Sequence, residues 1–142
     1  MNVKHVSIVV IVVVIIAIAF YLLSPLFIVK HANETMPEGK IIAEGVLQAG
    51  AHDVKGKVLI IEQDGKRYLR FEDLDTVNGP DLRIYLSSDK SASDYVDLGA
   101  IRATKGSVNY ELPPGVELSK YNKVLIWCRA FRVLFSFAAL PS

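Results

Sequence analysis

Two patterns of hydrophobic residues divide the chain. Residues 6–29 contain no charged side chain and are almost entirely apolar. About 20 apolar residues are enough to cross a bilayer as a helix. We therefore predict a transmembrane helix at about residues 6–29, within a membrane anchor formed by residues 1–30. The alternatives are a helix buried in a protein core and a cleaved signal peptide, with Ala17-Ile18-Ala19 as its small-residue cleavage site.

The residues that flank this run decide its orientation only weakly. Lys4 and His5 precede the run together with the α-amino group, and Lys30 and His31 follow it, so the positive charges are nearly balanced. A signal-anchor with such a short leader usually keeps that leader in the cytoplasm. We expect a single-pass membrane protein whose C-terminal domain is extracytoplasmic.

A polar segment follows the anchor. Residues 31–40 include the turn-forming sequence of residues 36–39, and they predict a polar tether between the anchor and a domain. The triplet that begins at Asn33 also matches the N-glycosylation sequon, although it lies only a few residues from the anchor.

From residue 41 onward, short alternating runs of apolar and polar residues replace the continuous apolar run. Helical periodicity is weak, and turn sequences separate strand-like segments. Asp64-Gly65 is typical of a tight hairpin because glycine accepts a positive φ. Gly79, Pro80 and Asp81 predict a second turn, in which we expect the Asp81 carboxylate to accept backbone hydrogen bonds.

The spacing of these segments predicts the fold class. Expected strands lie at residues 41–47, 54–63, 66–71, 82–87, 98–103 and 107–112, and two more follow the loop that opens at residue 113. Short strands at this spacing are typical of all-β domains. We predict that residues 41–142 form an all-β domain of seven or eight short strands, as an antiparallel β-sandwich or barrel-like structure.

The last two strands carry the only cysteine of the chain. Val124, Ile126 and Cys128 share one face of an extended segment, since successive side chains on a strand alternate between faces. The apolar positions then change from even to odd numbers, at Phe131, Val133, Phe135 and Phe137. A change of parity requires an extra residue or a bend, so we place a bulge or corner at Arg129-Ala130.

Charge and motif content exclude several functional classes. The formal net charge is +1, and the charged residues are scattered, so nucleic acid is not an expected partner. The chain has no phosphate-binding loop, no paired-cysteine metal motif and no serine nucleophile elbow. Only His31 and His52 lie beyond the anchor. We therefore do not expect a stand-alone enzyme.

Cys128 and His52 remain as candidates for chemistry. A free cysteine is often a small core residue. In an exported domain an unpaired cysteine also fits a redox-active thiol, because structural cysteines there occur in pairs. Arg129 and Arg132 could favour its thiolate. His52 is either an exposed loop residue or a metal ligand; with Cys128 it could supply two ligands to copper or axial ligands to haem, although not a complete zinc site.

The relative position of these two residues is testable. Both lie near the ends of expected strands. If those ends coincide, we predict that the Cys128 sulfur lies within about 6 Å of a His52 ring nitrogen, where a protonated imidazole favours the thiolate. A sulfur enclosed by apolar side chains, with His52 at the opposite end, would leave Cys128 as a core residue.

Short motifs distributed along the domain resemble a known family. In the first half they are Gly45, His52, Gly56, Val58, Gly79-Pro80-Asp81-Leu82 and Tyr85-Leu86; in the second half they are Leu98-Gly99, Gly106, Tyr110, Leu112-Pro113, Ile126-Trp127-Cys128, Phe131, Val133 and Phe135. Their order and spacing, over residues 40–140, are similar to those of the DM-thirteen domain. That domain occurs beside DOMON modules, in Skeletor-type proteins and in short membrane-anchored microbial proteins. Ser136 departs from the resemblance, since a glycine is more typical there.

The resemblance implies an extracytoplasmic all-β domain with a role in electron transfer or redox chemistry centred on Cys128. Our leading hypothesis is therefore a membrane-tethered redox domain, with lipid around its N-terminal helix and a separate redox protein as its partner. The alternatives are a binding or structural module of the envelope, in which Cys128 is only a core residue, and a metal or haem carrier that uses His52 and Cys128. The sequence identifies no cofactor.

Overall fold

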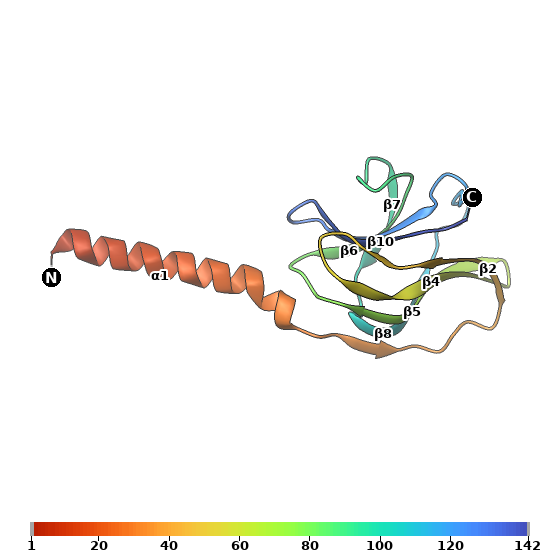
Figure 1. The fold of residues 1–142 in the computed structure, drawn as a ribbon, viewed down its shortest axis with the longest axis horizontal. Coiled ribbons are helices and arrows are strands. Elements are labelled where there is room, and N and C mark those ends of the chain that lie inside the picture. Colours follow the sequence, from red (N-terminus) through yellow and green to blue (C-terminus); the bar gives the residue numbers. More distant parts are fainter. Residues whose placement is uncertain (1, 142) are drawn as a thin grey trace.

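The N-terminal apolar run forms a helix that projects from the rest of the chain in the computed structural model, which describes residues 2–141 (Figure 1). The α-helix α1 spans Val3–Leu23, and the short 3-10 helix η1 spans Ser24–Phe27. The α-helix ends earlier than predicted, because Pro25 has no N–H to continue the helical hydrogen bonds and disfavours the α conformation before it.

This helix has the properties of a membrane-spanning segment. The stretch Val3–Phe27 has a mean hydropathy of 3.3 and is long enough to cross a bilayer. No residue of α1 is buried, so the helix does not form part of the domain core. Its length and composition are consistent with a single-pass anchor.

Ten strands make up the domain. They are β1 (His31–Asn33), β2 (Lys40–Val46), β3 (Gln48–Ala49), β4 (Val54–Gln63), β5 (Lys66–Thr76), β6 (Leu82–Ser87), β7 (Tyr95–Ala100), β8 (Lys105–Glu111), β9 (Lys123–Cys128) and β10 (Val133–Ala139). They form two sheets of five strands, with the orders β1-β8-β5-β4-β2 and β3-β10-β9-β6-β7. The all-β prediction is confirmed, with ten strands rather than seven or eight. Neighbouring strands are antiparallel, except that β1 and β8 pair in parallel.

The differences from the predicted strands have local causes. β1 and β3 have only three and two residues, too few to show an alternating pattern. β5 continues beyond Phe71 because its pairing with β8 shifts register between Phe71 and Leu74, which interrupts the alternation. The hairpin at Asp64-Gly65 is as predicted, with positive φ angles of 51° and 78° at its two central residues.

The inner faces of the two sheets share one apolar core. Ile60 and Phe71 from the first sheet and Ile84 and Ile126 from the second are completely buried in it. Burial of each side chain of this size stabilises the fold by about 1.5–3 kcal/mol. A smaller cluster of Tyr85, Leu125 and Phe137 lies apart from this core.

The hairpin of β9 and β10 corrects one prediction. Residues 129–132 form a turn between the two strands, but the bulge lies within β10, where the register shifts between Leu134 and Ser136. Phe135 therefore belongs to the main core, whereas Phe137 belongs to the smaller cluster. The predicted stripe of odd-numbered residues does not lie on a single face, and Phe131 is exposed in the turn.

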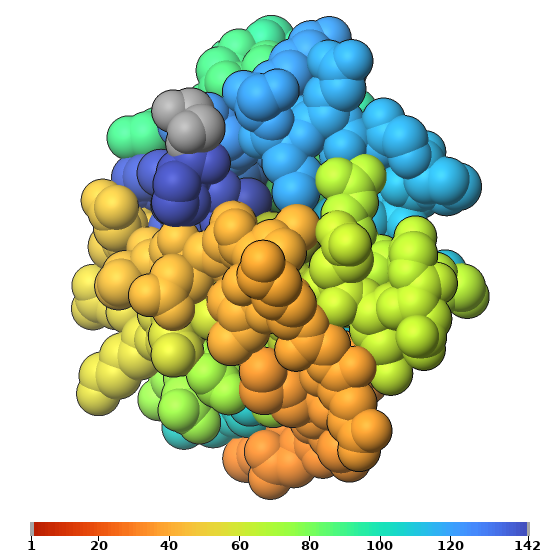
Figure 2. Space-filling model, turned by 90° about the vertical axis from the view of Figure 1, so that its right-hand side faces the viewer, coloured from red at the N-terminus to blue at the C-terminus, as the bar shows by residue number. Residues whose placement is uncertain are grey.

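The segment between the helices and β2, residues 30–39, is bound to the first sheet, and we call it the strap. The Lys30 amide donates to the Thr104 hydroxyl at 2.9 Å, and the Lys30 carbonyl accepts from the amides of Thr104 and Lys105. β1 then pairs with β8. Figure 2, which looks at the domain from the side away from the helix, shows the last part of the strap crossing the surface in orange.

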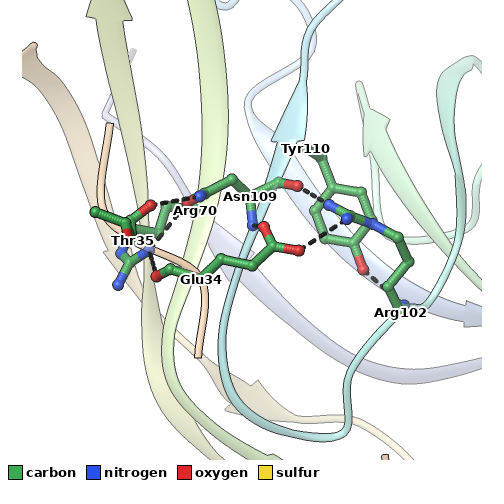
Figure 3. A network of polar contacts seen from close by, with 6 residues as sticks. All are labelled: Glu34, Thr35, Arg70, Arg102, Asn109 and Tyr110. Carbon is green, nitrogen blue, oxygen red and sulfur yellow. Dashed lines mark hydrogen bonds and ion pairs between the residues drawn. The ribbon is translucent and has the colours of Figure 1, made fainter. Parts of the chain in front are cut away.

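Glu34 is the centre of a polar network that holds the strap (Figure 3). Its carboxylate accepts from the Arg102 guanidinium at 2.8 Å and from the Asn109 amide at 2.8 Å. Its backbone carbonyl accepts from Arg70 at 3.0 Å, and the Asn109 side chain donates to the Thr35 carbonyl at 2.8 Å. The strap is therefore part of the domain structure over residues 30–35.

Candidate thiol site

Cys128 is the last residue of β9, as the sequence predicts. Its Cα partners are Leu82 on β6 and Val133 on β10, so it lies between two strands of the second sheet. Its exposed fraction is 0%, and it is a free cysteine within the main core. A reagent in solution therefore has no direct path to the sulfur in this conformation.

Two loops close the core next to the neighbours of Cys128. A Cβ atom added to Gly79 would lie 3.0 Å from the Phe135 ring and 3.2 Å from the Leu82 side chain, so the turn packs tightly on both. The His52 ring lies on the Phe135 ring, with 4.1 Å between centroids, and the His52 amide donates to the Phe135 carbonyl at 3.2 Å. We call Cys128, Leu82, Val133, Phe135 and these two loops the thiol end.

His52 and Cys128 lie at the same end of the domain. His52 lines an apolar cavity together with Val133, which is the Cα partner of Cys128. That the Cys128 sulfur lies within about 6 Å of a His52 ring nitrogen stays a prediction. Within residues 2–141 no group of three or more His, Cys, Asp or Glu side chains is arranged to hold a metal ion. His52 and Cys128 therefore have no third ligand of these types beside them in that range.

Trp127 points away from the core and takes part in an aromatic group on the other face of the second sheet. The Tyr85 and Tyr95 rings stack with 4.1 Å between centroids, and Trp127 lies 6.4 Å from Tyr85. Burial raises the pKa of Tyr85 to about 12, and its hydrogen bond with Tyr95 adds to the shift. Arg129 and Arg132 line the same surface hollow as these rings. Both arginines therefore line the hollow on the Trp127 face of the second sheet, whereas Cys128 is buried in the main core.

Asp81 links the turn at Gly79 and Pro80 to the hairpin turn after β9. Its carboxylate accepts from the Arg129 guanidinium at 2.7 Å, and its backbone carbonyl accepts from the Arg129 amide at 2.9 Å. The ion pair raises the pKa of Arg129. We expected backbone donors for this carboxylate; instead its donor is a side chain 48 residues away in sequence, which no local motif indicates.

The sequence also gave no sign of the apolar cavity beside the thiol end. The cavity has a volume of about 440 Å³ and lies between the C-terminal part of the helix and the domain. Ala19, Leu22 and Leu23 line it from the helix, and Phe131 and Val133 line it from the hairpin. Its two walls are far apart in the sequence, so only the tertiary structure brings them together.

Comparison with known proteins assigns the domain to a family. Residues 46–140 match the family described as Electron transfer DM13, and this range contains β3 to β10 with both His52 and Cys128. No match is found among curated proteins or among solved structures. Because the match covers more than half of the sequence, the chain belongs to the electron transfer DM13 family.

Proposed function

We propose that this protein is a membrane-tethered, extracytoplasmic electron-transfer domain whose reactive group is the Cys128 thiol. The apolar helix Val3–Phe27 supports the tether, and the family match supports the redox role. One observation carries the assignment to Cys128: the only thiol of the chain is the last residue of its strand, and loops close the core beside its neighbours Leu82 and Phe135.

The chemistry that fits a lone thiol is exchange with a disulfide of a separate protein. The Cys128 thiolate attacks one sulfur of that disulfide, a new S–S bond forms, and the old S–S bond breaks. The second partner sulfur leaves as a thiolate and takes up the proton that Cys128 has lost. The partner must be a separate molecule because the chain contains no second cysteine.

Such an exchange requires the thiol end to open, since Cys128 is completely buried. The loops that carry His52 and Gly79 are the elements to move, because they cover Phe135 and Leu82 without belonging to either sheet. In the proposed mechanism, His52 lies at the opening and its imidazole accepts the thiol proton.

The second candidate is a binding or structural module of the envelope in which Cys128 is a core residue. The complete burial of Cys128 among apolar side chains favours this reading. The carriage of copper or haem by His52 and Cys128 is a third hypothesis. The first two candidates differ in one measurable property, which is the reactivity of the thiol in the folded protein.

The test uses the full-length protein in nanodiscs. We expect glutathione disulfide to add one glutathione to Cys128, and a maleimide to label it, faster than the protein unfolds globally. Unfolding is followed separately by fluorescence in urea, and Cys128→Ser provides the unlabelled control. A His52→Phe variant should change the pH dependence of labelling. Labelling no faster than global unfolding would overturn the redox assignment and support the core reading.

A second measurement tests the tether. The protein should remain with membranes after carbonate extraction, and protease added from outside should reach the domain. Recovery of the full-length chain in the soluble fraction would contradict the proposed anchor.

A further inference from the structure

We propose that the turn between β9 and β10, residues 129–132, docks on the surface of the bilayer, with Phe131 among the lipid acyl chains and Arg132 at the headgroups. The inference rests on the proposed anchoring of the helix and adds a second, independent contact between the protein and the membrane. It would hold the thiol end next to the lipid.

Phe131 is positioned for this contact by the hairpin. Its side chain is 55% exposed at the tip of the turn, although it is a large apolar residue. In Figure 1 the turn between β9 and β10, in dark blue, lies on the helix side of the domain. Phe131 faces Leu22 and Leu23 of the helix across the cavity of about 440 Å³. An aromatic side chain on an exposed turn is costly in water but common at a membrane interface.

The depth of the helix residues indicates what fills the cavity. The charged residue Lys4 and the polar residue His5 precede the apolar run. A span of about 20 residues that begins at Val6 therefore ends near Pro25. Leu22 and Leu23 then lie within the last turn of the span. Phe131, on the opposite wall of the same cavity, lies at a similar depth, so the occupant consistent with this geometry is lipid.

The charges around the tip fit anionic headgroups. Arg132 is exposed and forms no ion pair within residues 2–141, whereas Arg129 is paired with Asp81. Lys30, the first charged residue after the span, is also exposed and without an ion pair in that range. Arginine and lysine close to a bilayer surface are attracted by anionic lipids. An exposed apolar side chain next to an unpaired arginine is the arrangement expected of a residue that enters the interface.

The test is quenching of a single tryptophan by brominated lipid. The full-length protein is placed in vesicles of phosphatidylcholine and phosphatidylglycerol, in a Trp127→Phe background. Three variants each carry one new tryptophan: Phe131→Trp at the tip, Phe20→Trp in the helix, and Glu117→Trp in the loop before β9, at the opposite end of the domain. If Trp127→Phe does not fold, Trp127 is retained and the added signal of each new tryptophan is compared.

We expect lipid brominated near its headgroup to quench Phe131→Trp clearly and to leave Glu117→Trp unquenched. Phe20→Trp should be quenched by lipid brominated deeper in the acyl chain. Omission of phosphatidylglycerol, or Arg132→Gln, should reduce quenching of Phe131→Trp, with an effect on docking of about fivefold for one arginine. Quenching at Phe20 without quenching at Phe131 would overturn the docking and leave the anchor intact. An unquenched Phe20→Trp would overturn the anchor itself.

Discussion

The strap and the two loops of the thiol end both lie outside the central strands, yet different forces hold them. The strap is fixed by charge-assisted hydrogen bonds around Glu34. The thiol end is closed by packing of Phe135 against Gly79 and His52, with neutral backbone hydrogen bonds such as that from the His52 amide to the Phe135 carbonyl. Polar networks demand a defined geometry, whereas apolar contacts adapt to displacement. The comparison shows a strap that connects the helix to the first sheet through a polar network, and a thiol end whose proposed opening would have to separate packed apolar groups.

This contrast also explains how the anchor is connected to the domain. The strap begins shortly after η1, and its hydrogen bonds to β8 start at Lys30. A fixed strap transmits the position of the helix to the sheets, so the proposed anchoring of the helix would define which side of the domain faces the bilayer. The thiol end lies on that side, because its cavity is walled partly by the helix.

The largest expected effect comes from removing the Phe135 ring. Phe135→Ala should lower the free energy of unfolding by about 3–5 kcal/mol, the usual cost of truncating a buried phenylalanine. It should also increase maleimide labelling of Cys128 under native conditions, since the loops that carry His52 and Gly79 pack on this ring. Urea denaturation and labelling rates give the two values. Phe131→Ala is the matched control, because Phe131 is exposed in the same hairpin and should change stability in detergent by less than about 0.5 kcal/mol. Equal losses of stability in Phe131→Ala and Phe135→Ala would contradict the distinction between an exposed Phe131 and a buried Phe135.

A smaller effect is expected in the strap. Glu34→Ala removes the acceptor of two hydrogen bonds, one of them from a guanidinium, and should cost about 1.5–3 kcal/mol in unfolding free energy. Hydrogen exchange should increase at the Asn109 and Lys105 amides, while Cys128 labelling stays unchanged. Glu38→Ala, an exposed residue of the same strap, serves as the control. Faster labelling of Cys128 in Glu34→Ala would show that the two regions are coupled rather than independent.

The ion pair of Asp81 and Arg129 joins the turn at Gly79 to the hairpin turn after β9 at the surface. Asp81→Asn should lower the melting temperature less than Glu34→Ala does, because exposed ion pairs contribute little and are screened by salt. Thermal unfolding at low and high salt measures this. A loss of stability that persists in high salt would show that the Asp81 side chain stabilises the turn by more than its charge.

The smallest effect lies in the loop between β6 and β7, outside both regions. Hydrogen bonds from Ser93 and Ser91 lower the pKa of Asp89 from 3.8 to about 2. The stabilisation from this carboxylate is therefore present above pH 3.8 and is lost as the pH falls toward 2. Melting curves between pH 5 and pH 2 should show a component of the decline that Asp89→Asn abolishes. Cys128 labelling should be no more affected by Asp89→Asn than by a neutral substitution of the exposed Asp64.

The sequence by itself determined the elements whose cause is local. An uncharged apolar run gives the helix, and alternation gives β4 and β6. Asp64-Gly65 gives a hairpin because both residues accept positive φ. The place of Cys128 at the end of a buried strand follows from the same alternation.

Only the tertiary structure decided the features that join distant segments. The strap pairs with β8 through contacts to residues some seventy positions later. Asp81 meets Arg129 across 48 residues, and the helix faces Phe131 across almost the whole chain. The bulge in β10 is decided by how two sheets share one core, since it directs Phe135 inward and Phe137 away from that core. Periodicity reports which side chains share a face, but it carries no information on which distant segment that face will meet.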